Sequence, residues 1–130
     1  MEALERIRSI ISGFAGYDDA PQRRLSDEQI RGFVGEVLAE LPAVEIDALT
    51  PEERSSYDRV LLRCEFVNYE VFRVFDADPT PERVLATLTA DADVIEMACV
   101  LREAAEQRPN GTLGALSQAF DKRDAAMLLS

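Results

Sequence analysis

The chain has 130 residues, of which 25 are acidic and 14 basic, and its formal net charge is -11. A chain of this length buries about two-thirds of the surface that it exposes when unfolded, which is enough for one domain with an apolar core. The sequence contains no histidine, and its two cysteines, Cys64 and Cys99, lie far apart. It therefore lacks the commonest general base and the residue pairs typical of zinc sites. We expect a non-catalytic protein that holds no metal ion and no cofactor.

The distribution of charge limits the partners. Residues 26–49 contain six acids and one base, whereas residues 1–25 contain four of each. Such an acidic field repels polyphosphate, so we expect no nucleic-acid partner. The longest uncharged stretches fall far short of the ~20 residues that a membrane span needs, and charges near the N-terminus leave no apolar segment of a signal peptide. We expect no membrane partner and a cytoplasmic location, in a bacterium because Arg and Ala are abundant.

Helical periodicity dominates the sequence, and no stretch alternates between apolar and polar residues as a strand would. Near the start, apolar residues recur every three or four positions, at Leu4, Ile7, Ile11 and Phe14. This spacing predicts a first helix that ends between Gly13 and Gly16. A polar loop should follow over residues 17–24.

The next start signal is a capping box, in which a hydroxyl and an amide three residues later satisfy the first free N–H groups of a helix. Ser26 and Gln29 have this spacing, and Leu25 is placed to pack on Ile30. They predict that a second helix begins at Ser26, and Pro42 ends it.

A third helix should begin at Thr50 and Pro51, since Thr is a good N-cap and Pro fits the first helical turn. Its apolar positions form a sector about 160° wide on a helical wheel. This pattern continues to Phe75, so we predict one long central helix over residues 51–75.

The same start signal recurs at Thr80 and Pro81, and predicts a short helix over 81–89. A kink or break should follow near 90–93, then another helix that ends at Pro109 and a last one from Thr112. The sequence therefore predicts an all-α single domain over residues 1–130, an irregular bundle of five or six helices around the central helix.

The back of the predicted central helix carries a second apolar stripe. Leu62, Phe66 and Tyr69 fall on the side away from the core sector, and Arg59 and Arg73 flank them. A helix that is apolar on two sides either lies between other helices of its domain or offers one side to a partner. Because Tyr, Phe and Arg are favoured in interface cores, the stripe predicts a contact surface for another protein or for a second copy of the chain.

One face of the second helix carries small residues. Gly32, Gly35 and Ala39 share this face, which is either exposed to solvent or a place where another helix or a peptide approaches closely.

An alternative function is the binding of a small apolar ligand between the second and third helices. Its pocket would be lined by Phe33, Tyr57 and Phe72.

The leading hypothesis for function is a protein–protein interaction module that acts as an adaptor or associates with itself. Net acidity allows a second alternative, an immunity-like or anti-toxin-like protein that neutralises a basic partner. An enzyme is the least favoured reading. Its polar groups would come from the predicted loop, at Tyr17, Asp18, Asp19, Arg23 and Arg24.

Overall fold

The computed structural model describes residues 2–104 and 111–130, and in these residues the chain forms α-helices and no strand. The all-α class is therefore confirmed. The helices are α1 (Glu2–Ile10), α2 (Ala20–Ala39), α3 (Ala43–Asp47), α4 (Pro51–Glu65), α5 (Tyr69–Ala77), α6 (Pro81–Glu103) and α7 (Thr112–Met127). The helix end predicted at Pro109 lies outside the described residues.

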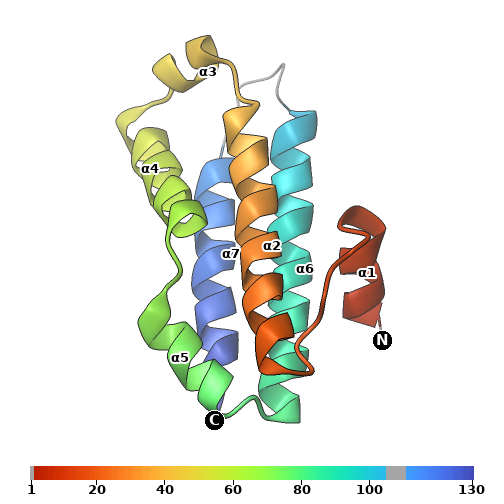
Figure 1. Cartoon of the computed structure of the whole chain (residues 1–130). Helices are drawn as coiled ribbons and strands as arrows, with labels where there is room; N and C mark the ends of the chain where they lie inside the picture. Colours follow the sequence, from red (N-terminus) through yellow and green to blue (C-terminus); the bar gives the residue numbers. More distant parts are fainter. Residues whose placement is uncertain (1, 105–110) are drawn as a thin grey trace.

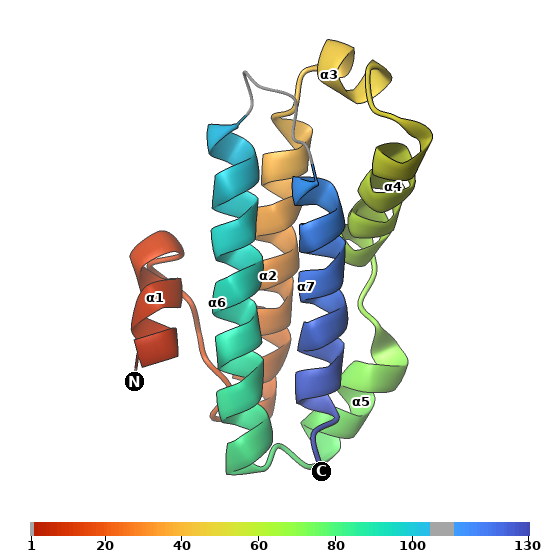
Figure 2. The ribbon, with the colours of Figure 1, turned by 180° about the vertical axis from the view of Figure 1, so that it is seen from behind.

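Three long helices, α2, α6 and α7, lie side by side and form the frame of the molecule (Figures 1 and 2). On one side of this frame α1 packs against α6, and on the other side α4 packs against α2 and α7. Below α4 in Figure 1, α5 packs against α7, and the short α3 lies at the opposite end of the bundle. Two helices connect the parts of the molecule: α6 contacts α1, α2 and α7, and α7 contacts α4, α5 and α6.

The predicted central helix over 51–75 is wrong, because the chain leaves helical geometry at Phe66. The backbone of Phe66 is extended, with φ -127° and ψ 133°, and Asn68 is the N-cap of α5. The break lets α4 bury Val60 while α5 separately buries Phe72 and Phe75.

The start of α2 also differs from the prediction. Asp19, not Ser26, caps the helix, and its carboxylate accepts a hydrogen bond from the backbone N–H of Gln22 at 2.9 Å. Ser26 is fully buried and donates to the carbonyl of Gly16 at 2.6 Å, where a positive φ of 87° turns the chain. The side chain of Gln29 bonds to the backbone of the same loop. The two residues thus hold the loop before α2 rather than start a helix.

No break occurs near residues 90–93, so the predicted short helix over 81–89 is the first part of the continuous α6. The start signals at Thr50 and Thr80 are confirmed: each hydroxyl accepts a hydrogen bond from the backbone N–H three residues later, at 3.2 Å. Asp91, which lies within the predicted break, is buried in the middle of α6 and bonds to Tyr17 and Arg123.

The apolar core lies where the frame helices meet. Its largest fully buried side chains include Ile30, Leu38, Ile95, Leu101, Leu113, Leu116 and Phe120. Close to the C-terminus Met127 is buried, whereas Leu128 and Leu129 are exposed. None of the described helices combines the length and apolar character that crossing a membrane requires.

Candidate functional site

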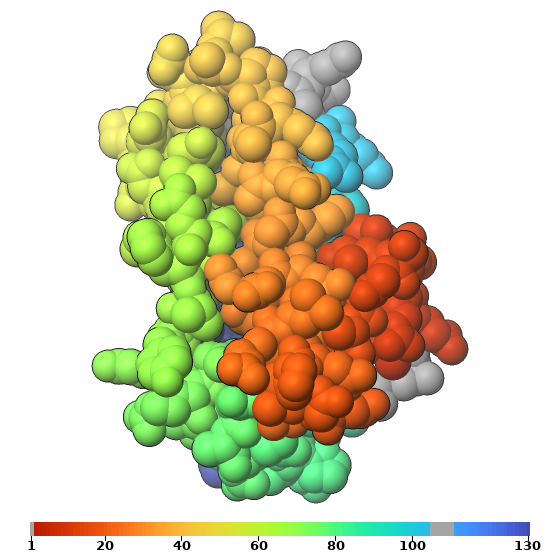
Figure 3. Space-filling view, viewed as in Figure 1, coloured from red at the N-terminus to blue at the C-terminus, as the bar shows by residue number. Residues whose placement is uncertain are grey.

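Large apolar side chains are exposed where α4 ends and α5 begins. Leu62 is 56% exposed, Phe66 62%, Val67 37% and Tyr69 66%. We call these four residues the α4–α5 surface. In the space-filling view this stretch of the chain lies on the outside of the molecule beside α2, and no other helix covers it (Figure 3). The structure thus leaves open to solvent the apolar stripe predicted from the sequence.

Three arginines border the α4–α5 surface. Arg59 precedes Leu62 by one helical turn, Arg73 follows Tyr69 by one turn, and Arg24 reaches the surface from α2. All three are exposed, and within the described residues none of them has a hydrogen-bond or ion-pair partner. Every other described arginine donates to a carboxylate or to a backbone carbonyl. Among the described residues, the arginines without such a partner are therefore those around this surface.

A hollow of about 160 Å³ lies between α2 and the start of α5, next to the surface. Val67, Tyr69 and Phe72 provide its apolar lining, and Arg24 and Arg31 provide two of its polar walls. Phe72 is buried and packs edge-on against Phe75, with ring centroids 6.4 Å apart, so this part of the lining is anchored in the core.

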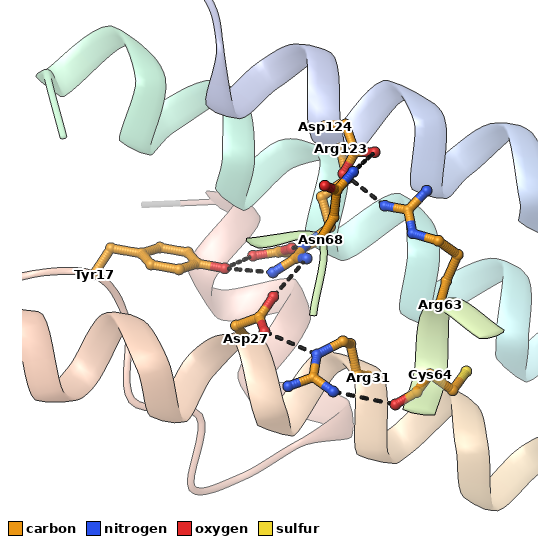
Figure 4. A network of polar contacts seen from close by, with 9 residues as sticks. Tyr17, Asp27, Arg31, Arg63, Cys64, Asn68, Arg123 and Asp124 are labelled. Atoms are coloured by element: carbon orange, nitrogen blue, oxygen red, sulfur yellow. Dashed lines mark hydrogen bonds and ion pairs between the residues drawn. The ribbon is translucent and has the colours of Figure 1, made fainter. Parts of the chain in front are cut away.

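One carboxylate of α7 holds both sides of the break between α4 and α5. Asp124 accepts a hydrogen bond from Arg63 of α4 at 2.6 Å and another from the side-chain amide of Asn68 at 3.1 Å (Figure 4). The guanidinium of Arg63 also lies over the ring of Phe120, 5.3 Å from its centroid. The position of the α4–α5 surface is therefore fixed by bonds to the frame.

A second tie comes from α2. Arg31 donates to the backbone carbonyl of Cys64 at 3.2 Å and to Asp27 at 2.8 Å (Figure 4). Carbonyl groups at a helix C-terminus lack intrahelical partners, and an arginine is a suitable donor to them. Near the other end of α5, Arg23 pairs with Asp76 at 2.8 Å.

Beneath these ties, a buried polar network joins the frame helices. Arg123 of α7 pairs with Asp27 of α2 at 2.9 Å and with Asp91 of α6 at 2.5 Å. The hydroxyl of Tyr17 donates to Asp91. Figure 4 shows Tyr17, Asp27 and Arg123 converging between the helices. Because its members bond to one another, the network orients α2, α6 and α7 and offers no free group to a ligand.

Burial shifts the acid–base behaviour of this network. It raises the pKa of Asp91, although Arg123 and the hydroxyl of Tyr17 oppose that effect. It also raises the pKa of the Tyr17 hydroxyl well above its ordinary value. For Arg123 burial disfavours the charged form, but the neighbouring Asp91, Tyr17 and Asp27 together raise its pKa further.

The face of small residues on α2 divides into two parts. A Cβ atom added at Gly35 would lie 3.6 Å from the Cβ of Cys64, so α4 approaches α2 closely there. Nothing lies within 4 Å of the corresponding position at Gly32, and Ala39 is exposed. A close helix contact therefore holds for Gly35 and not for the other two.

The three aromatic residues proposed to line one apolar pocket lie in different places. Phe33 borders a groove near the end of α1, and the guanidinium of Arg102 lies over its ring, 5.2 Å from the ring centroid. Tyr57 is half-buried with Arg54 over its ring at 5.5 Å, whereas Phe72 faces the hollow beside α5. The pocket predicted between the second and third helices is wrong, because the residues contribute to separate surfaces.

The polar loop predicted over 17–24 is wrong as well. Tyr17 and Arg23 are buried, Asp19 caps α2, and Arg23 and Arg24 belong to the first turns of α2. Asp18 remains exposed at the end of the loop. Tyr17, Asp19 and Arg23 thus have structural roles, whereas Arg24 is exposed like Asp18.

Sequence reasoning missed the buried network, although the sequence contains signals for it. Arg123 continues the spacing of Leu113, Leu116 and Phe120 and precedes Met127 by four residues, which places it on the core face of α7. Asp91 lies between apolar neighbours in α6, and Asp27 and Arg31 are one turn apart. The sequence does not show which helix supplies the ion-pair partner of each of these residues.

Comparison of the chain with models of protein families, with curated proteins and with solved structures finds no match. Among residues 2–104 and 111–130, no three His, Cys, Asp or Glu side chains lie so that they hold a metal ion.

Proposed function

We propose that the chain is a non-catalytic protein-binding module and that the α4–α5 surface is its contact. One observation carries the proposal: Leu62, Phe66 and Tyr69 are each more than half exposed on the folded chain. Single exposed apolar residues are ordinary, but neighbouring large ones mark binding sites on soluble proteins.

The composition of the surface supports this function. Aromatic residues and arginine are enriched in protein interfaces, and the residues that contribute most binding energy are often Tyr, Trp and Arg. Tyr69 and Phe66 provide the aromatic groups, and Arg59 and Arg73 flank them.

The hydrogen bonds that hold the α4–α5 surface in place also favour binding of a partner. Asp124 fixes both sides of the break, and Arg31 holds the last turn of α4. A surface that is already ordered loses less conformational freedom when a partner docks. The same ties argue against a flexible linker between α4 and α5.

The cytoplasm is the proposed location, because Cys64 and Cys99 are both free thiols. The alternative of an acidic chain that neutralises a basic partner depends on the net charge of -11 and on no particular cluster of described residues.

Site-specific photo-crosslinking tests the proposed function. A benzophenone amino acid replaces Phe66 in one variant and Val44, which is 71% exposed on α3, in a matched control. In cells that make the protein, we expect the position 66 variant to give a discrete adduct with another protein or a second copy. Excess unlabelled wild-type chain should compete for this adduct, whereas the chain with Phe66→Glu should not.

Analytical ultracentrifugation over a wide concentration range completes the test. If the chain is a monomer throughout, and positions 66 and 44 give the same adducts, the α4–α5 surface is not a contact and the proposal fails.

A further inference from the structure

The free arginines indicate the chemistry of the partner. In a chain with 25 acids and 14 bases, a guanidinium readily finds a carboxylate of its own chain. Arg24, Arg59 and Arg73 are exceptions within the described residues, and all three border the α4–α5 surface. Arg groups at an interface commonly pair with carboxylates, so these three favour a partner with carboxylates at matching places.

The hollow beside the surface indicates a second element of the partner. Its volume is about 160 Å³, and Val67, Tyr69 and Phe72 form its apolar lining. A protein cavity of about 150 Å³ can hold a benzene ring. One aromatic or branched aliphatic side chain of a partner therefore fits the hollow.

A second copy of the chain is the less suitable occupant. In a two-fold contact each copy meets the surface that it presents itself. Each copy has a net charge of -11, so two copies repel one another.

The neighbouring acids limit how the carboxylates of the partner are arranged. Glu28, Glu65 and Glu70 are exposed in the same region, so a uniformly acidic segment would be repelled. The partner needs spaced carboxylates and an apolar face between them. A helix meets this requirement, because its side chains at intervals of three and four residues lie on one face.

We propose that the occupant of the α4–α5 surface is an amphipathic helix of a different protein. One bulky apolar side chain of this helix enters the hollow, and its spaced carboxylates pair with Arg24, Arg59 and Arg73. This inference rests on the proposed function, since it names the partner of the same surface.

A displayed library of helical peptides tests the inference. One face of each peptide varies among Leu, Ile, Phe, Tyr and Trp, and the positions beside that face vary among Glu, Gln and Lys. We expect selection on the wild-type chain to enrich peptides with Glu at spaced flanking positions. The Arg73→Glu chain should bind them about fivefold more weakly or worse at low salt, because an exposed attraction becomes a repulsion.

Two further chains serve as controls. Lys122→Glu makes the same change of charge at an exposed position that borders a different groove, between α6 and α7, and should leave the affinity unchanged within about twofold. Selection on the Phe66→Glu chain should enrich no such peptides, which places the binding on the α4–α5 surface.

Other outcomes overturn the inference in distinguishable ways. Enriched peptides without a preference for Glu, or with a preference for Lys, would reject the acidic helix and leave the protein-binding function intact. A dimer that Phe66→Glu dissociates would identify a second copy as the occupant. If no peptides are enriched over the Phe66→Glu chain and no crosslinked partner is found, both proposals fail.

Discussion

Arg123 shows how much one residue contributes to the arrangement of this fold. Its guanidinium is buried and pairs with carboxylates from two other helices, Asp27 and Asp91. Removing charges from water costs several kcal/mol per ion, so a buried pair adds little net stability, whereas loss of one partner costs about 3–5 kcal/mol. The network therefore penalises wrong arrangements of α2, α6 and α7 more than it stabilises the correct one.

Asp91 makes stability depend on pH in a particular direction. Burial raises its pKa in the folded chain, so the folded state binds this proton more tightly than the unfolded state does. The stability that this carboxyl contributes is greatest below the ordinary aspartate pKa of about 3.9 and is lost as the pH rises through the raised pKa. We expect the free energy of unfolding of the wild type, minus that of Asp91→Asn, to decrease as the pH rises from about 4 to 7. Urea denaturation at a series of pH values measures this difference.

A matched control for this prediction lies on the same helix. Asp93 is exposed and pairs with Arg6 at 3.2 Å, so Asp93→Asn should change the free energy of unfolding by less than about 1 kcal/mol. A difference between wild type and Asp91→Asn that grows as the pH rises would contradict the direction of the shift.

At the scale of helices, the predictions that were confirmed depend on hydrogen bonds within one helical turn. Thr50 and Thr80 act within one helical turn, and sequence located both helix starts. Ser26 failed as a start because its hydroxyl bonds to Gly16, ten residues earlier, in a loop whose path depends on the rest of the fold. The break at Phe66 was missed for the same reason: the partner of Asn68 is Asp124 of α7, which no local pattern reveals.

Because α4 contacts α2 at Gly35 and not at Gly32, substitutions at these two glycines should change the free energy of unfolding differently. Gly35→Ala places its Cβ 3.6 Å from Cys64, an ordinary contact, so the better helix propensity of Ala should raise the free energy of unfolding by about 0.5–1 kcal/mol. Gly35→Leu should lower it by about 1–3 kcal/mol, because the larger side chain pushes α4 away.

Gly32 provides the control, since nothing lies within 4 Å of an added Cβ there and Gly32→Leu should be tolerated. Thermal and urea unfolding of the four chains measure the effects. Equal destabilisation by Leu at both positions would show that α4 does not approach α2 at Gly35.

At the scale of the whole molecule, the sequence located a second apolar stripe but left open whether another helix covers it. Periodicity placed Leu62 and Phe66 away from the core of α4 without any knowledge of its neighbours. The hollow beside them needed tertiary structure, because its walls come from α2 and α5. The pocket predicted from Phe33, Tyr57 and Phe72 failed because Phe33 borders the groove near α1, and because Tyr57 and Phe72 belong to two helices where one was predicted.

The excess of acids affects the stability of the entire chain. With a net charge of -11 the folded state repels itself, and salt screens this repulsion over a distance of about 10 Å at 0.1 M. We expect the midpoint of thermal unfolding at neutral pH to rise when sodium chloride is increased from about 20 to 300 mM. Near the isoelectric point, about pH 4.4, the rise should vanish. A midpoint that falls with salt at neutral pH would mean that attractive ion pairs outweigh the repulsion.

Asp124 receives bonds from Arg63 and Asn68, on either side of the break, while belonging to neither helix that it joins. The angle between α4 and α5 therefore depends on a residue of α7, in addition to the contacts that Arg31 and Arg23 make from α2. A change at this one position would alter the relative orientation of two helices without altering the sequence of either. The shape of the exposed surface can thus change through a residue of α7 that does not belong to that surface.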